Sequence, residues 1–106
     1  MKMNHILRGK VRGDLEWDER SGKTYEMHLD VPEKFQRRGI GRSMLRELED
    51  LIRERDGMSI YTYSAADNTA AKGFFLAMGF TKYLIEGFYG VGRAAYMWVK
   101  VVGKPK

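Results

Sequence analysis

The sequence of 106 residues contains no cysteine and only two histidines, His5 and His28. The absence of cysteine excludes disulfides, thiolate metal sites and a cysteine nucleophile, and two histidines are too few for a typical structural metal site. No segment approaches the roughly 18 consecutive apolar residues of a membrane span. The first ten residues are polar and basic and lack the apolar block of a secretory signal. We therefore predict a cytoplasmic protein that has neither a metal site nor a membrane partner.

Repeats, low-complexity tracts and linkers are also missing. The length is that of one domain, so residues 1–106 are predicted to form a single unit. The net charge of +5 is unevenly distributed: the segment from Lys34 to Arg46, both included, contains five basic residues and no acidic residue. Residues 61–106 carry six basic and two acidic residues. A basic surface attracts phosphate, nucleic acid or acidic protein, although a solvated basic face is the simpler interpretation.

Alternating apolar residues predict a β-hairpin near the N-terminus. Val11 to Trp17 alternates loosely, Arg20 to Lys23 is a plausible turn, and Tyr25 to Val31 alternates cleanly. Pro32 ends the second strand, because proline cannot donate a hydrogen bond to a neighbouring strand. One face of that strand is polar, which predicts that one side of the sheet is exposed.

The rest of the chain changes between helical and strand patterns. Apolar residues at helical spacing predict a helix over residues 39–56 that ends at Gly57. The further elements predicted are a strand at residues 58–63, a helix capped by Asp67 or Asn68 and ending at Met78, and strands at residues 80–86 and 94–102. This order predicts an α/β fold with a mixed sheet and one parallel crossover around the first helix.

The most informative segment is residues 31–42, between the second strand and the first helix. Unpaired amides and the positive end of the helix dipole attract phosphate to a helix N-terminus. Gly39 and Gly41 lack side chains that would keep an anion away from the backbone. Three arginines add positive charge there: Arg37, Arg38 and Arg42. A diphosphate is therefore the expected ligand. The patterns G-x-x-x-x-G-K-[ST] and G-x-G-x-x-G do not open a helix in this chain, which argues against a P-loop hydrolase and a dinucleotide fold.

Two blocks resemble sequence signatures of the GNAT acyltransferase superfamily. Residues 36–41, Gln-Arg-Arg-Gly-Ile-Gly, resemble the signature Q/R-x-x-G-x-G/A. The second block resembles N-x-x-A-x-x-x-Y-x-x-x-G-F, with phenylalanine at the tyrosine position, and consists of Asn68, Ala71, Phe75, Gly79 and Phe80. A weaker resemblance relates residues 88–89 and 94–99 to the closing hairpin of the family's ribosomal-protein N-terminal acetyltransferases. Together these resemblances cover residues 22–102.

The resemblance implies a GNAT-like fold with a V-shaped opening between the strands at residues 25–31 and 58–63, and acetyl-CoA (coenzyme A) as the cofactor. Backbone groups of the first strand would pair with the pantetheine arm, and the turn before the helix would hold the pyrophosphate. The residues implied in cofactor binding are Leu29, Asp30, Val31, Gln36, Arg37, Arg38, Gly39, Ile40, Gly41, Arg42, Asn68 and Phe75. The implied activity is acetyl transfer in a ternary complex to an amine of a small molecule, a protein N-terminus or a lysine, with a backbone N–H stabilising the oxyanion.

The candidates for proton transfer are Glu26, His28 and Tyr89. Glu26 could accept a proton directly or through water, and the imidazole of His28 suits base chemistry near neutral pH. For both residues a solvated surface side chain is the more frequent interpretation, and Tyr89 could equally be a packing residue. In the family, a tyrosine protonates the leaving thiolate, but Phe75 occupies its place and has no proton to give. Its loss would slow catalysis, since general acids contribute about 10² to 10⁴-fold. The candidate replacements are Tyr61, Tyr63 and Tyr89.

Family members usually carry a strand and two helices before the hairpin, and the roughly 20 residues that precede the turn here show no helical pattern. We therefore expect a short GNAT-like fold that lacks this strand and these helices. The acceptor site is then open to a large substrate, or a homodimer completes it. A non-catalytic acetyl-CoA sensor is the alternative function. A nucleic-acid-binding domain, suggested by charge and interleaved tyrosines, is disfavoured because it does not explain the basic cluster beside a glycine turn.

Overall fold

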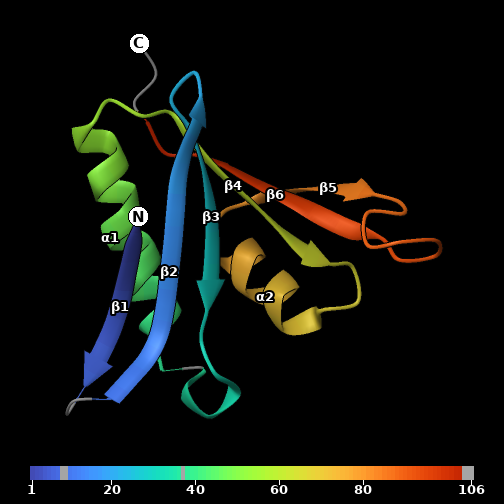
Figure 1. The fold of residues 1–106 in the computed structure, drawn as a ribbon, viewed down its shortest axis with the longest axis horizontal. Helices are drawn as coiled ribbons and strands as arrows, with labels where there is room; N and C mark the ends of the chain where they lie inside the picture. The colour runs from blue at the N-terminus through green and yellow to red at the C-terminus, as the bar shows by residue number, and fades with distance from the viewer. Residues whose placement is uncertain (8–9, 37, 104–106) are drawn as a thin grey trace.

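The structure, a computed structural model, describes residues 1–7, 10–36 and 38–103, which form one mixed sheet with two α-helices (Figure 1). The strands are β1 (Lys2–Leu7), β2 (Lys10–Ser21), β3 (Thr24–Asp30), β4 (Ser59–Ala65), β5 (Thr81–Ile85) and β6 (Ala95–Val101). The helical elements are the 3₁₀ turn η1 (Glu33–Phe35), α1 (Ile40–Glu54) and α2 (Thr69–Ala77). The sheet order is β1-β2-β3-β4-β6-β5, in which β3 and β4 run parallel and the other neighbours antiparallel. These elements confirm the predicted mixed α/β fold.

The N-terminal strand β1 shows that the expectation of a chain without a strand before the hairpin is wrong. It pairs antiparallel with β2, but the register shifts between His5 and Ile6. Ile6 pairs with Val11, and the two side chains are 58% and 49% exposed. The loose alternation of residues 11–17 suggests one shared side for Val11, Leu15 and Trp17, but only Leu15 and Trp17 are buried. An irregular edge strand of this kind lacks the clean alternation that identifies a strand from sequence.

The hairpin of β2 and β3 has the geometry that the sequence predicts. Residues 22–23 both have positive φ, 54° and 70°, as in the two-residue turns that match the twist of paired strands. The register places Asp18 opposite Glu26 and Glu16 opposite His28. Because side chains alternate across a strand, these polar groups share one face and the apolar residues share the other.

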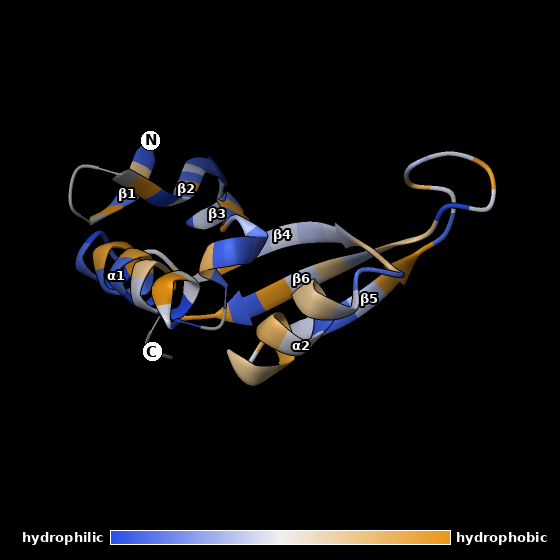
Figure 2. Cartoon of the chain, turned by 90° about the horizontal axis from the view of Figure 1, so that it is seen from below, coloured by the Kyte–Doolittle hydropathy of each residue, from blue (hydrophilic) through white to orange (hydrophobic). Residues whose placement is uncertain are grey.

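Both α-helices cover the same face of the sheet. In Figure 2, α1 lies beneath β1, β2 and β3, whereas α2 lies beneath β4, β5 and β6. The core between the helices and the sheet consists of Leu15, Trp17, Tyr25, Met27, Ile40, Met44, Leu45, Leu48, Ile52, Ile60, Phe75, Met78, Phe80, Trp98 and Val102. Since no helix of the described residues covers the opposite face, the polar side chains of β2 and β3 on that face remain in solvent.

Trp98 joins α2 to the half of the sheet that contains β4 and β6. Its side chain is completely buried, and its indole N–H donates to Ser64 Oγ at 2.8 Å. The ring of Phe75 from α2 lies 5.4 Å from the Trp98 ring and 5.2 Å from that of Phe80. Aromatic pairs at such distances contribute about 0.5–1.5 kcal/mol beyond their buried area. The position of α2 is therefore fixed by specific contacts.

Within the described ranges, no helix is long and apolar enough to cross a membrane. The same part of the chain holds no group of three or more His, Cys, Asp or Glu side chains that could bind a metal ion. Its notable polar cluster lies on the open face of β3, where Arg20, Tyr61 and His28 surround Glu26.

We predict that Leu48→Ala lowers the free energy of unfolding by about 2–5 kcal/mol, because Leu48 of α1 is completely buried and its truncation leaves a cavity. The matched control is Leu84→Ala. Leu84 of β5 is 57% exposed, so this change should cost less than about 1 kcal/mol. Urea unfolding followed by circular dichroism measures both values. Equal losses for the two variants would contradict the assigned core.

Candidate functional site

Strands β3 and β4 pair over three residues each and then separate (Figure 1). The last pair is Glu26 with Tyr61, and beyond it β3 keeps only β2 as a neighbour and β4 only β6 among the described strands. The facing backbone edges of residues 27–30 and 62–65 therefore have no strand partner. Such groups need water or a ligand, because unpaired backbone donors and acceptors are costly to bury. This fork matches the V-shaped opening predicted between the two strands.

A cleft of about 290 Å³ lies at the fork. It is lined by His28 and Leu29 of β3, Thr62, Tyr63, Ser64 and Ala65 of β4, Asn68, Ala71 and Phe75 of α2, and Tyr89 of the loop between β5 and β6. The predicted site residues among them are His28, Leu29, Asn68, Phe75 and Tyr89. The fold thus brings together predicted residues from three parts of the chain that are distant in sequence.

Thr62 and Ser64 are cleft residues that the sequence analysis missed. They are 3% and 7% exposed although they are polar, and they alternate with Tyr63 along β4. Their side chains share the buried face of the strand with Ile60. Their position was the available signal, because they occupy the inward-facing places of this strand. Buried polar groups require partners, so polar residues at such places indicate a site.

The turn before α1 has the properties of an anion site. Gly39 is the N-cap of α1 in the left-handed conformation, with φ of 78°, and no side chain caps the helix. The first turn of α1 contains no acidic residue, so its first amides lack a side-chain acceptor. A Cβ at Gly39 would meet no atom within 4 Å, so the approach to the turn is open. The helix dipole adds positive partial charge at the same place, which favours phosphate.

Gly41 serves a different purpose from the one expected. A Cβ at this position would lie 3.2 Å from Cε1 of Phe74 and 3.4 Å from Cδ2 of Leu29. Its missing side chain therefore allows α1 to approach α2 and β3 closely, and does not open the backbone to an anion. The amide of Gly41 remains a predicted phosphate contact. The side chain of Ile40 is buried in the core, so its predicted contact also involves the backbone.

Basic side chains surround this turn. The ring of Phe35 has the cations of Arg12, Lys34 and Arg38 at 4.9, 5.0 and 5.9 Å from its centroid. Such cation–π contacts bring like charges together around one aromatic ring. Arg38 and Arg42 are exposed, so their charge is available to a ligand at the turn.

The loop between β3 and η1 contains further predicted cofactor residues. The Gln36 side-chain amide donates to the Val31 carbonyl at 2.9 Å, so this residue fixes the shape of the loop. Val31 is half-buried and Asp30 is exposed. Arg37 lies outside the described residues, so its predicted role stays a prediction.

The Glu26 carboxylate organises the polar groups at the fork. Arg20 Nε donates to Glu26 Oε1 at 2.8 Å, and the Tyr61 hydroxyl donates to the same oxygen at 3.3 Å. His28 Nε2 lies 3.4 Å from Glu26 Oε2. The Glu26 side chain is 18% exposed and does not line the cleft, whereas His28 is 65% exposed and does. The carboxylate therefore orients its neighbours, and His28 lies at the edge of the cleft.

Tyr61 is not among the residues that line the cleft, and its hydroxyl donates to Glu26. It is therefore not positioned to donate a proton within the cleft. Burial raises the pKa of the Tyr61 phenol, and the charge and hydrogen bond of Glu26 raise this pKa further. The other two candidate proton donors, Tyr63 and Tyr89, both line the cleft. The Phe88 ring stacks on Tyr63 at 4.7 Å and meets Tyr89 edge-on at 4.8 Å, which holds the loop against β4.

Helix α2 forms one wall of the cleft, and its N-cap residue Asn68 lies there too. Phe75, at the position of the family tyrosine, is 7% exposed and packs against Phe80 and Trp98. Asn68 caps the helix, because its Oδ1 accepts a hydrogen bond from the Ala71 amide at 3.0 Å. The Asn68 side-chain nitrogen is left as the donor that this residue can offer to a ligand.

Comparison with known proteins identifies the class to which this fold and cleft belong. Residues 4–80 match the acetyltransferase (GNAT) family, which is well over half of the chain. The chain therefore belongs to the GNAT family of acetyltransferases. This result confirms the resemblance indicated by the two sequence blocks.

One relative is the N-alpha-acetyltransferase RimI of Mycobacterium tuberculosis, which is 38% identical to this chain over 84 residues. That alignment covers 76% of this chain and 51% of RimI, so the chain spans about half the length of this relative.

Solved structures show the same fold. The ribosomal-protein-S18-alanine N-acetyltransferase of Escherichia coli superposes with a TM-score of 0.85 at 18% identity, covering 100% of this chain and 71% of that chain. An aminoglycoside 6'-N-acetyltransferase in complex with coenzyme A gives a TM-score of 0.84 at 16% identity, covering 99% of this chain and 73% of that chain. At these identities the likeness establishes the fold.

We predict opposite effects of one substitution at two glycines. Gly39→Ala should lower the free energy of unfolding by about 1–2 kcal/mol, because an L-residue is strained at its φ of 78°. Gly73→Ala should raise it by up to about 1 kcal/mol, since Gly73 lies within α2 and a Cβ there would meet no atom within 4 Å. Chemical unfolding measures both changes. An unchanged stability in the Gly39 variant would contradict the left-handed turn.

Proposed function

We propose that residues 1–106 form one acetyl-CoA-binding domain that transfers an acetyl group to an amine. The observation that carries the proposal is the fork between β3 and β4, which opens beside the uncapped N-terminus of α1. The backbone at residues 29–31, where Leu29 and Asp30 have no strand partner on the side of β4, can pair with the amides of the pantetheine arm. The turn at residues 38–42 can hold the pyrophosphate, because its amides and arginines suit an anion.

His28 is the proposed base. Acetyl-CoA supplies the acetyl thioester when it is bound. His28 is one of the residues that line the cleft, so its imidazole can accept the proton that the amine loses as its nitrogen bonds to the acetyl carbon. As the carbon–sulfur bond breaks, the Tyr89 hydroxyl can give a proton to the leaving sulfur. Glu26 has a positioning role in this proposal, since Arg20 and Tyr61 occupy one of its oxygens and the other faces His28.

The proposed acceptor is the N-terminal amine of a polypeptide. The names of the Mycobacterium tuberculosis and Escherichia coli relatives both specify N-acetyltransferases of this type. The open face of the sheet supports a polypeptide acceptor, because an extended chain can reach the cleft from that side without displacing a described helix. An acceptor screen could instead identify a lysine side chain or a small amine. Measurement of the oligomeric state would show whether a second copy of this chain completes the site.

A non-catalytic acetyl-CoA sensor is the second candidate. It is favoured by Phe75, which is buried among aromatic rings and offers no proton where the family has a tyrosine. The two candidates differ in a direct measurement. The enzyme releases free thiol when a peptide with an unblocked N-terminus is added, whereas the sensor binds acetyl-CoA without thiol release.

We predict micromolar-range binding of acetyl-CoA in calorimetric titration, and similar binding of the inert analogue desulfo-CoA. Arg38→Gln should weaken both about tenfold, because it removes a charge-assisted contact with the pyrophosphate. The matched control is Arg55→Gln at the other end of α1, which should bind as the unaltered protein does. A folded protein that binds neither compound would refute the proposed function.

We predict that His28→Asn lowers kcat by about 10² to 10⁴-fold. A base must be deprotonated to act, so in the unaltered protein kcat/KM should fall at acidic pH as both His28 and the acceptor amine become protonated. In the His28→Asn variant, the fall at acidic pH should reflect protonation of the acceptor amine alone. Glu26→Gln should cost less, about 10 to 100-fold, as orienting residues do, and Glu19→Gln on the exposed part of β2 is its matched control. The roles would be reversed if Glu26→Gln altered the pH profile and His28→Asn did not.

A further inference from the structure

The sheet face opposite the helices is apolar over β4, β5 and β6. Residues at directly opposite positions of neighbouring strands share one face, and the register of these three strands groups several large uncharged side chains in this way. They alternate with residues such as Trp98, which faces α2, so they lie on the side away from the helices. In Figure 2 this side is uppermost, and no described helix lies above it. The residues of this apolar face are Tyr61, Tyr63, Tyr83, Met97, Val99 and Val101.

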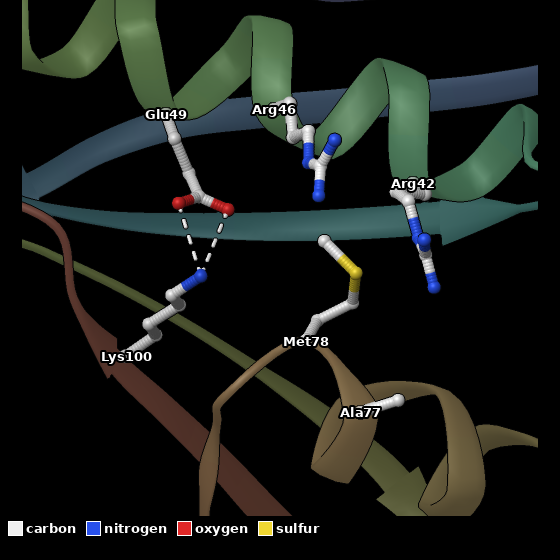
Figure 3. Close-up of a pocket in the computed structure, with 6 residues that line it drawn as sticks. All are labelled: Arg42, Arg46, Glu49, Ala77, Met78 and Lys100. Carbon is white, nitrogen blue, oxygen red and sulfur yellow. Dashed lines mark hydrogen bonds and ion pairs between the residues drawn. The ribbon is translucent and has the colours of Figure 1, made fainter.

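The charged side chains of these three strands lie on the helix side of the sheet. Only Lys82 and Lys100 are charged among the residues of β4, β5 and β6. Lys82 Nζ lies 4.9 Å from the centre of the Tyr96 ring. Lys100 Nζ lies 3.0 Å from Glu49 Oε1 of α1, toward which it points in Figure 3. The apolar face therefore carries no charge, although 31% of the residues in the chain are charged.

Several side chains of the apolar face remain in solvent. Tyr83 is 52% exposed and Val101 is 68% exposed. Phe88 stacks on Tyr63 and is itself 44% exposed, so the loop between β5 and β6 extends the same surface. Three strands about 4.8 Å apart, of which β4 and β6 are seven residues long, span about 300 Å² of sheet. An exposed apolar patch of this size on one chain is typical of a binding surface.

The other half of the open face, over β2 and β3, is charged. Asp14 lies opposite Asp30, and Asp18 lies opposite Glu26. A second copy of the chain cannot place this half against itself without bringing like charges together, which is destabilising. It can place the apolar face against itself, because no charge is then buried. Charge thus selects the part of the open face that is able to meet its own copy.

We propose that the apolar face is the interface of a homodimer with a two-fold axis. Such an axis brings the same surface of both copies together, and dimers of this symmetry are the commonest homo-oligomers. Stable interfaces bury about 800 Å² per partner and consist of an apolar core within a polar rim. The apolar face is large enough to form this core. The loop between β5 and β6 and the polar groups around Glu26 border it and supply the rim.

The dimer places the partner copy beside the cleft. Tyr63 belongs both to the apolar face and to the lining of the cleft, so the second copy lies at one edge of the cleft. The charged half over β2 and β3 stays free, and an acceptor can still approach the cleft over it. Dimer formation itself does not depend on the proposed reaction.

The test measures the mass of the protein by light scattering during size-exclusion chromatography, over a range of concentrations. The unaltered protein should have twice the mass of the chain. Tyr83→Glu should weaken the dimer by about 100-fold or more, because the two-fold axis buries the new charge twice. The matched control is Leu84→Glu, since Leu84 is 57% exposed on the same strand but lies on the other face, and the dimer should persist. Val101→Glu is a second, independent disruption, and circular dichroism verifies that each variant is folded.

A folded protein that stays monomeric at every concentration would overturn the proposed dimer. A dimer that survives both Tyr83→Glu and Val101→Glu would also overturn it, because the interface would then lie elsewhere. Equal disruption by Leu84→Glu and Tyr83→Glu would assign the contact to the edge of β5 and not to the apolar face. Assemblies that grow beyond two copies would exclude the two-fold axis. A dimer that binds no acetyl-CoA in calorimetric titration would refute the proposed function alone.

Discussion

The separation of β3 from β4 beyond Glu26 and Tyr61 is the constraint on which the rest of this structure depends. The two α-helices lie under the two halves of the sheet, and the close approach at Gly41 sets Phe74 of α2 against the start of α1 and against Leu29. These side chains pack near the place where the two strands diverge. The strands' facing backbone groups lose their partners, and the cleft, its polar rim and its need for a ligand all follow from that loss.

Basic and acidic groups gather at different places on the fold. Exposed arginines lie at the start of α1, whereas Asp14, Glu16, Asp18 and Glu26 share the open face of β2 and β3 with Arg20. The hairpin register places Asp14 opposite Asp30 and Asp18 opposite Glu26, and like charges at such positions are destabilising. The ion pair of Arg20 with Glu26 offsets part of this cost.

The aromatic groups explain how the chain accommodates phenylalanine where its family has tyrosine. Phe75 packs against Trp98, and this contact holds α2 on the sheet. Proton donation can then pass to the loop, where Phe88 packs between Tyr63 and Tyr89 at the edge of the cleft. A residue used for packing on α2 and a proton donor on a loop can each be optimised separately, since neither has to serve both purposes.

The sequence by itself determined the helices, five of the six strands, the glycine turn and the family, because periodicity, caps and motif spacing depend on neighbouring residues. It also placed Glu26 and His28 on one exposed face. Only the tertiary structure decided that His28 lies at the cleft while Glu26 is held by its neighbours, and that Gly41 packs against α2. It alone revealed β1. These features depend on strand register and helix packing between segments distant in sequence, which local patterns do not encode.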